Sequence, residues 1–249
     1  MLKKLRLFAS IVLVVFSSFV LAQTPPANKD ESRCNTDLTH DPFQGFNRKV
    51  FAFNDVLDRA ILRPVATGYR YITPQPVERG VSNFFGNLGE IRNTFNNILQ
   101  WKWYQAGNDA GRFIVNSTFG IAGLFDVAKH MDLPKAQRED FDQSLAKWGV
   151  CSGPFLVLPF IGPSTLRDAF SLPFDGAANP TFYIDHDLTR IEVNALDIID
   201  TRAGLLGVDE LVAGDKYLFF RDAYKQRRVY LENDGEVKFD AEDEFADFQ

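Results

Sequence analysis

The fold of this chain turns on one apolar stretch, Val150-Cys151-Ser152-Gly153-Pro154-Phe155-Leu156-Val157-Leu158-Pro159-Phe160-Ile161-Gly162-Pro163-Ser164-Thr165-Leu166-Arg167-Asp168. Its longest unbroken apolar run covers only residues 155–158, whereas a membrane-spanning helix needs about 20 apolar residues. Each proline removes a backbone donor and fixes φ. The stretch is therefore predicted to be an irregular apolar loop. Such a loop either fills the core of its own domain, lies in a membrane interface, or lines a cavity.

The N-terminus has the pattern of a secretory signal. Positive charges at Lys3, Lys4 and Arg6 precede an apolar segment over residues 7–21, and the small residue Ala22 precedes Gln23. This pattern predicts a signal peptide over residues 1–22, cleaved between Ala22 and Gln23. An uncleaved anchor is the alternative, because the apolar segment slightly exceeds a typical signal core of about 7 to 15 residues. Both interpretations predict export.

The net charge excludes some classes of partner. The chain carries −6 at pH 7, and removing the three positive charges of the signal makes it −9. Nucleic-acid binding needs a basic face, and attachment to anionic lipid needs basic clusters. We therefore expect no nucleic-acid partner, and expect any contact with a membrane to use apolar side chains.

Composition divides the exported chain into three parts. Residues 23–40 are polar and predict a flexible linker, residues 41–232 form the folded domain, and residues 233–249 form an acidic, disordered tail. The only two cysteines are Cys34 and Cys151. In an oxidising compartment they could form a disulfide bond, and two unrelated thiols are the alternative.

The apolar spacing predicts helices. Apolar residues recur every three or four positions over residues 81–99, which predicts one long amphipathic helix. Gly86 and Gly89 inside it indicate a close neighbour. A second apolar face covers residues 43–57 and is predicted to stop at Arg63-Pro64. Further helices are predicted over residues 104–117, 121–130, 188–202 behind Asp187, and 215–231. Because Pro, Gly and Asn interrupt every alternating run, the predicted fold class is all-α.

Catalytic residues are not predicted. His40, His130 and His186 lie far apart and none stands in an H-E-x-x-H pattern. Ser152 and Ser164 lie in Gly-Pro loops and not in a nucleophile elbow. The sequence thus predicts no catalytic residue, no metal site and no cofactor, and a protein that is not an enzyme.

Arg167 and Asp168 allow two interpretations. Asp168 could stand near the start of a helix, where a carboxylate is stabilising by about 0.3–1 kcal/mol. Alternatively the pair could form a polar gate or bind a lipid head group, because the arginine side chain binds phosphate well.

Short motifs distributed along the chain resemble one known family. They are Asp41-Pro42-Phe43-Gln44-Gly45-Phe46-Asn47-Arg48, Arg63-Pro64-Val65, Pro74-Gln75-Pro76, Ser82-Asn83-Phe84, Gly86-Asn87-Leu88, Asn116-Ser117-Thr118, Gly153-Pro154-Phe155, Leu158-Pro159-Phe160, Gly162-Pro163, Arg167-Asp168 and Arg221-Asp222-Ala223-Tyr224. Their number, order and spacing resemble the MlaA/VacJ family over residues 41–235.

The resemblance implies a fold and a function. Members of the family form an all-helical ring embedded in the inner leaflet of a Gram-negative outer membrane, on its periplasmic side. A passive amphipathic channel removes mislocalised phospholipid from the outer leaflet and hands it to the periplasmic carrier MlaC, which maintains lipid asymmetry. Members also associate with trimeric porins. Two alternatives from other classes are a porin-associated periplasmic adaptor without lipid passage and an exported hydrolase.

The resemblance also assigns candidate residues. Asn54 and Asp55 are candidates for a channel edge, while Arg167 and Asp168 stay the gate candidates that their own chemistry suggests. Gln23 stands where family members have the lipobox cysteine, so we expect attachment through the domain or porins and not through an acyl anchor. Candidates for embedding in the membrane are Phe43, Phe46, Phe51, Phe53, Phe155, Leu156, Leu158, Phe160 and Ile161.

Overall fold

The computed structural model describes residues 41–135, 137–212 and 214–236. The signal peptide with its cleavage site between Ala22 and Gln23, the linker, Cys34 and the tail beyond residue 236 lie outside the described residues. The disulfide bond between Cys34 and Cys151 therefore stays a prediction.

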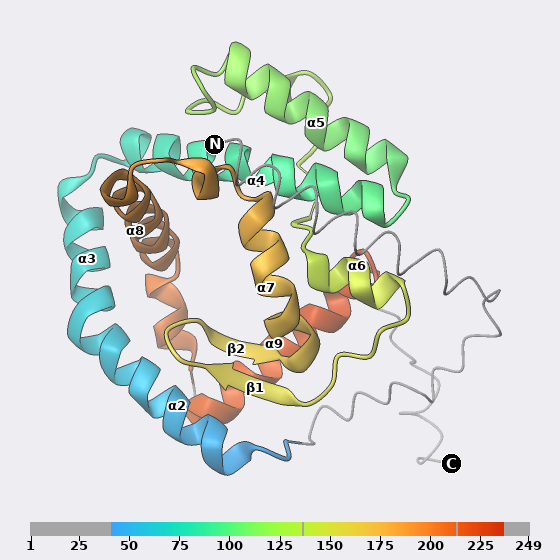
Figure 1. The fold of residues 1–249 in the computed structure, drawn as a ribbon. Coiled ribbons are helices and arrows are strands. Elements are labelled where there is room, and N and C mark those ends of the chain that lie inside the picture. Colours follow the sequence, from blue (N-terminus) through green and yellow to red (C-terminus); the bar gives the residue numbers. More distant parts are fainter. Residues whose placement is uncertain (1–40, 136, 213, 237–249) are drawn as a thin grey trace, which may run out of the picture.

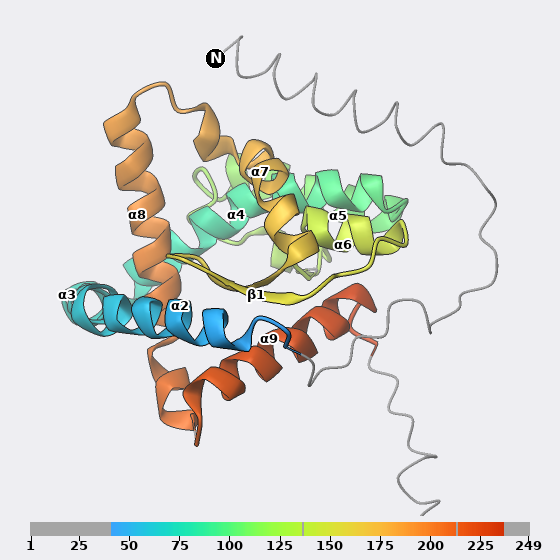
Figure 2. The same ribbon diagram turned by 60° about the horizontal axis from the view of Figure 1, so that its bottom comes forward.

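The described part of the chain forms a ring of helices (Figure 1). Helices α2, α3 and α4 follow one another around an arc, and α7 and a small hairpin close the opposite side. Helix α9 crosses the hairpin beside α2 (Figure 2). The helices are α2 (Gln44–Leu57), α3 (Arg63–Ile72), α4 (Gln75–Leu99), α5 (Trp103–Thr118), α6 (Phe141–Lys147), α7 (Leu166–Ala178), α8 (Asp187–Gly204) and α9 (Lys216–Glu232).

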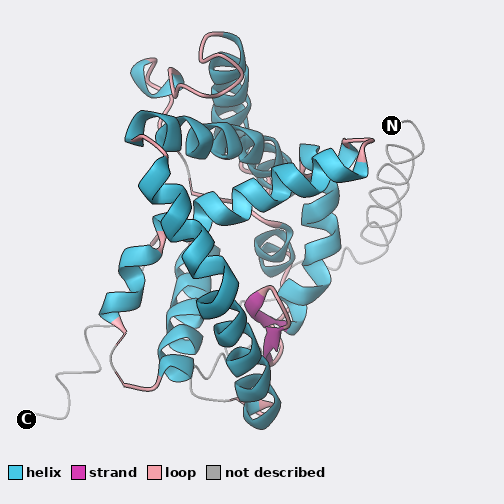
Figure 3. Ribbon diagram, turned by 90° about the vertical axis from the view of Figure 1, so that its left-hand side faces the viewer, coloured by secondary structure: helices cyan, strands magenta, loops and turns pink. Residues whose placement is uncertain are grey.

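The all-α prediction is confirmed, because helices dominate and the sheet has only two strands (Figure 3). Helices α4, α5, α8 and α9 cover the predicted segments. Asp215 caps α9 by accepting hydrogen bonds from the amides of Tyr217 and Leu218. Asp187, however, is the first residue of α8, and His186 precedes it at the N-cap.

One predicted helix end and one predicted helix are wrong. The helical conformation does not end at Arg63-Pro64. A five-residue π-helix, Asp58–Leu62, joins α2 to α3 without a break, and Pro64 lies in the first turn of α3. The helix predicted over residues 121–130 is also wrong. Ile121 and Ala122 have positive φ angles of 52° and 56°, so the chain turns there and only Ala128–His130 forms a 3₁₀ helix.

The apolar stretch is a hairpin and not an irregular loop. Strand β1 (Phe155–Leu158) pairs antiparallel with β2 (Gly162–Thr165), with Leu158 opposite Gly162. Proline is compatible with a strand at a sheet edge, which is where a two-stranded sheet places Pro163. Between the strands, Phe160 adopts a positive φ of 67°.

Candidate functional site

The interior of this protein is mainly polar. Among the described residues, 24 polar or charged residues are buried and only 11 apolar ones are. Charged side chains are rarely fully buried unless they are paired, so an interior of this composition requires a dense set of partners. It also leaves many apolar side chains on the outside.

Helix α4 shows this inversion most clearly. Its five buried residues are all polar, namely Asn87, Glu90, Asn93, Asn96 and Asn97. The apolar residues whose spacing predicted the helix are half-buried or exposed, and Ile98 keeps 41% of its surface accessible. The predicted helix is therefore correct, and the face that it packs against the protein is the polar one.

Arg112 on α5 joins the polar faces of α4 and α5. Its guanidinium donates to the carboxylate of Glu90 at 3.0 Å, to Asp126 at 2.9 Å and to the carbonyl of Leu133 at 2.7 Å. Nearby, Asn97 donates to Asp109 at 2.8 Å. Burial, with the Glu90 charge next in importance, raises the pKa of Asp109 to about 7.

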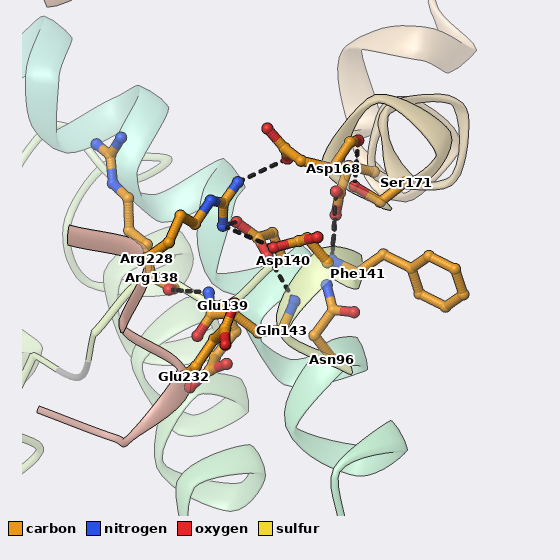
Figure 4. A network of polar contacts seen from close by, with 12 residues as sticks. Asn96, Arg138, Glu139, Asp140, Phe141, Gln143, Asp168, Ser171, Arg228 and Glu232 are labelled. Carbon is orange, nitrogen blue, oxygen red and sulfur yellow. Dashed lines mark hydrogen bonds and ion pairs between the residues drawn. The ribbon is translucent and has the colours of Figure 1, made fainter. Parts of the chain in front are cut away.

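A second ionic network joins α6, α7 and α9 (Figure 4). Arg228 binds Asp140 and Asp168, each at 2.6 Å. Arg167 binds Asp142 at 2.6 Å and also pairs with Glu232. The tyrosine hydroxyl of Tyr224 donates to Asp168 at 2.7 Å.

This network contradicts the assignment of Arg167 and Asp168 to a gate. Their exposed fractions are 6% and 7%, and their polar atoms bind other protein groups. Thr165 caps α7 by accepting from the amide of Asp168, so Asp168 stands in the first turn. The helix-start interpretation is correct, because burial leaves neither side chain available to a passing ligand.

The small apolar core lies between α2, the hairpin and α9. It contains Phe155, Val157 and Tyr217, with Phe51 packed against them. Phe155 is 2% exposed, and the ring centroids of Phe51 and Tyr217 lie 5.6 Å apart. Phe155 was predicted to embed in a membrane, and this was wrong because it packs inside the protein. Phe51 is half-buried against this core, and its embedding stays a prediction.

Two asparagines of α2 bind the outer edge of β1. Asn47 donates to the carbonyl of Phe155 at 3.0 Å and accepts from the amide of Val157 at 2.9 Å. Asn54 donates to the carbonyl of Leu158 and accepts from the amide of Phe160, both at 2.9 Å. Seven helical residues rise about 10.5 Å, and three strand residues rise about 10 Å. The distance between Asn47 and Asn54 along α2 thus matches the distance between their binding points on the hairpin. The two side-chain amides make hydrogen bonds that a third strand would otherwise make.

The remaining apolar candidates lie at the surface. Phe43, Phe46 and Phe53 are 46%, 56% and 47% exposed, and Phe160 and Ile161 in the hairpin turn are 75% and 63% exposed. Leu156 and Leu158 are half-buried. The rings of Phe53 and Phe160 contact edge to face, with centroids 5.4 Å apart, so α2 and the turn form one apolar surface.

A cavity of about 270 Å³ opens beside this surface, between α2, β2, α8 and α9. One part of its lining is apolar and the other is polar and charged. The apolar part is Phe51, Pro163, Leu205, Val208 and Phe220, and the polar part is Asn54, Asp55, Asp58, Arg202 and Lys216.

The charges in this cavity are paired. Arg202 forms a two-point ion pair with Asp58, with distances of 2.7 and 2.9 Å. Its hydrogen bond lowers the pKa of Asp58 against the opposing effect of burial. Asp55 pairs with Lys216 and with Arg59. Both channel-edge candidates, Asn54 and Asp55, therefore line this cavity, each held by a fixed partner.

The described residues contain no group of three or more His, Cys, Asp and Glu side chains placed to hold a metal ion. None of the helices in this part of the chain is long and apolar enough to cross a membrane. The fold and interior thus define a class of protein, a ring of helices with polar packing inside, apolar side chains outside and a cavity of mixed lining.

Comparisons with known proteins identify the family. The family described as MlaA lipoprotein matches residues 39–231, so the chain belongs to the MlaA lipoprotein family. It is 40% identical to the "Intermembrane phospholipid transport system lipoprotein MlaA" of Escherichia coli, over 80% of each chain. It is also 40% identical to an uncharacterised protein of Rickettsia felis, over 76% of each chain.

A solved structure has the same fold. It is described as "Structural basis for maintenance of bacterial outer membrane lipid asymmetry" and matches with a TM-score of 0.68 and 36% identity. The match covers 78% of this chain and 100% of that chain. The ring is therefore the fold of the family.

Sequence reasoning missed several residues of the site. Arg202 and Asp58 were not predicted, because 144 positions separate them along the chain. Asn47 is part of a family motif, but its contact with β1 was not predicted. The repeated asparagines inside the helix over residues 81–99 were an available signal, since asparagine is a poor helix former and needs a reason to recur.

Proposed function

We propose that this chain acts in phospholipid transport at the outer membrane and maintains its lipid asymmetry. It provides a passive amphipathic passage that takes mislocalised phospholipid from the outer leaflet and hands it to the periplasmic carrier MlaC. The names of its relatives indicate a phospholipid transport system. The chemistry of the cavity lining supports a passage for lipid. We infer that the protein is not an enzyme.

The two-sided lining of the cavity carries this proposal. A phospholipid has an apolar and a charged part, and the cavity offers Phe51, Leu205 and Val208 on one side with the Arg202–Asp58 pair on the other. Its 270 Å³ lies just below the range of about 300–1,000 Å³ for small-molecule sites. The cavity therefore accommodates part of a lipid at a time, as a passage does.

The apolar outer surface supports embedding in the periplasmic leaflet. Phe43, Phe46 and Phe53 on α2 continue into Phe160 and Ile161 of the hairpin turn, and burying one such side chain contributes about 1.5–3 kcal/mol. We propose this surface, flanked by Leu156 and Leu158, as the contact with acyl chains. A trimeric porin is the proposed second partner in the outer membrane.

The test is a deletion strain assayed for phospholipid on the cell surface. We expect the deletion to raise surface phospholipid and the wild-type gene to restore it. Leu205→Trp, which fills the cavity, should fail to restore it. The control Ile198→Trp lies on α8, which ends one residue before Leu205. Ile198 is 55% exposed and does not line the cavity, so this variant should restore the phenotype fully.

Two outcomes would contradict the proposal. Full restoration by Leu205→Trp would show that lipid does not pass through this cavity. No rise in surface phospholipid on deletion, with porin still co-purifying with the protein, would favour the adaptor without lipid passage.

A further inference from the structure

A second cavity, of about 140 Å³, lies between α4, α8 and the segment after α7. Three cationic side chains line it, Arg92 from α4 with Lys135 and Arg138 from the loop before α6. Phe85 and Leu88 form an apolar part of the same wall. The proposed passage does not use this cavity.

No carboxylate of the described residues is in direct contact with the three cations, although Asp175 and Asp197 act on Arg92, and Asp197 on Arg138, from a distance. Among the described residues, the side chains of Arg92, Lys135 and Arg138 make no hydrogen bond or ion pair, and Arg92 Nε is shielded from solvent without a partner. Figure 4 shows the guanidinium of Arg138 directed away from the ionic network beside it. Lys135 and Arg138 are exposed and Arg92 is half-buried, so the cost of an unsatisfied buried donor falls on the Nε of Arg92 alone. Three cations that line one cavity without an ion pair leave it a place for an anion.

Two carboxylates also line the cavity, and neither neutralises the cations. Glu90 is bound by Arg112 at 3.0 Å. Burial raises the pKa of Asp197, while Arg138 and Arg92 lower it, so this carboxylate interacts with the cations only across a distance. The lining keeps a positive excess.

Two glycines leave the cavity open. Gly86 and Gly89 line it. A Cβ added at Gly89 would meet nothing within 4 Å, and one at Gly86 would meet only the Lys135 ammonium at 4.0 Å. The sequence-based expectation of a close neighbour at these glycines is therefore wrong. Each glycine in the interior of a helix lowers helix stability by about 1 kcal/mol relative to alanine. Here the absence of a side chain at Gly86 and Gly89 leaves open space beside the cations.

We propose that this cavity binds the phosphate group of a phospholipid, with Arg92 and Arg138 as its ligands and Lys135 as a third positive charge. The inference rests on the proposed function and adds a head-group site to it. A volume of 140 Å³ is too small for a whole lipid, so the acyl chains lie outside the cavity. Phe85 and Leu88 at the wall favour a lipid phosphate over free phosphate, because they offer apolar contact that inorganic phosphate cannot use.

Calorimetric titration of the purified full-length chain in detergent tests this site. The probes are dihexanoyl phosphatidylglycerol, dihexanoyl glycerol without phosphate, and inorganic phosphate. We expect the phosphatidylglycerol to bind and to lose at least tenfold in affinity with Arg92→Gln, Arg138→Gln or Gly89→Leu. The matched control Arg79→Gln, an exposed arginine on the same helix, should bind as the wild type does.

Gly89→Leu keeps every charge and adds a good helix former, so it separates loss of the cavity from loss of folding. Gly89→Ala, which adds one carbon, should have an intermediate effect. Unchanged thermal unfolding of each variant confirms that the fold is intact.

Four results would overturn the proposal. Equal affinity of wild type and variants for phosphatidylglycerol would remove the site while leaving the proposed function standing. Binding of dihexanoyl glycerol as tight as that of phosphatidylglycerol would exclude the phosphate as the recognised group. Tighter binding of inorganic phosphate than of the lipid would make this a free-anion site. No lipid binding by the wild type, together with no surface-lipid phenotype on deletion, would remove the site and the proposed function together.

Discussion

The two sides of the ring pack by opposite chemistry. Between α4 and α5 the contacts are asparagines and ion pairs such as Arg112 with Glu90, whereas between α2, the hairpin and α9 they are Phe155, Val157 and Tyr217. On the polar side the apolar residues of α4 are half-buried or, like Ile98, exposed. The difference teaches that helical periodicity locates a helix, and that the partners offered by neighbouring helices decide which face is buried.

The largest expected effect comes from breaking the polar side at Arg112. Arg112→Ala leaves the buried Glu90 without its partner and removes a ligand of Asp126, and we expect a loss of about 3–5 kcal/mol in the free energy of unfolding. Urea unfolding in detergent measures it. The control Arg79→Ala, exposed on α4, should change stability by about 0.5 kcal/mol or less. A loss below about 1 kcal/mol for Arg112→Ala would mean that the polar side is not held by this ion pair.

The second prediction concerns Asn47, a polar side chain that binds the backbone of the apolar core. Asn47→Leu leaves the carbonyl of Phe155 and the amide of Val157 buried without partners. Each unpaired group costs about 1–3 kcal/mol, and burial of the apolar leucine side chain offsets part of the sum, so we expect a net loss of roughly 2–4 kcal/mol. Gln44→Leu, exposed at the start of the same helix, is the control. Equal stability of the two variants would show that the amide contacts do not hold the hairpin.

The third effect is a pH dependence located on the polar side. The pKa of Asp109 is raised from 3.8 to about 7, so the folded state binds this proton more tightly than the unfolded state. Its contribution is fully present below about pH 4 and is lost as the pH rises to about 7. We expect Asp109→Asn to match the wild type near pH 4 and to be more stable at pH 8 by on the order of 2 kcal/mol. Thermal unfolding at both pH values measures this, and a constant difference between them would contradict it.

The smallest effect on stability is expected on the outer apolar surface. Phe160 is 75% exposed and has a φ of 67°, a region that asparagine tolerates better. We expect Phe160→Asn to leave stability in detergent unchanged or to raise it by up to about 1 kcal/mol. Binding to lipid vesicles should fall about tenfold, since one exposed phenylalanine contributes about 1.5–3 kcal/mol on burial. Flotation with vesicles measures the binding, and unchanged flotation would show that the turn does not enter the membrane.

Much of the helical fold could be predicted from the sequence. Periodicity located α4, α5, α8 and α9, because amphipathic spacing survives whichever face is buried. It failed at residues 121–130, where two non-glycine residues adopt positive φ that no apolar pattern signals. It also failed at the hairpin, since Asn47 and Asn54 support β1 from a segment more than 100 residues away.

The candidate site was predicted only in part. Asn54 and Asp55 line a cavity and their place at a channel edge stays a prediction, whereas Arg167 and Asp168 are structural. An adjacent pair of opposite charges has the same sequence pattern whether it forms a gate or begins a helix. The residues that bind the pair, Asp142 and Arg228, distinguish the two roles, and they lie on other helices. The cation site at Arg92 and Arg138 was not predicted from the sequence, because a charge can be identified as unpaired only when the groups around it are known.

The amides of Asn47 and Asn54 have one further consequence. A strand edge with free backbone groups is a template on which other chains aggregate. Here side chains of α2 occupy the outer edge of β1 at Phe155, Val157 and Leu158, and the adjoining turn at Phe160, so that edge cannot recruit a strand from a second molecule. A chain with so many exposed aromatic residues thereby keeps one route to self-association closed.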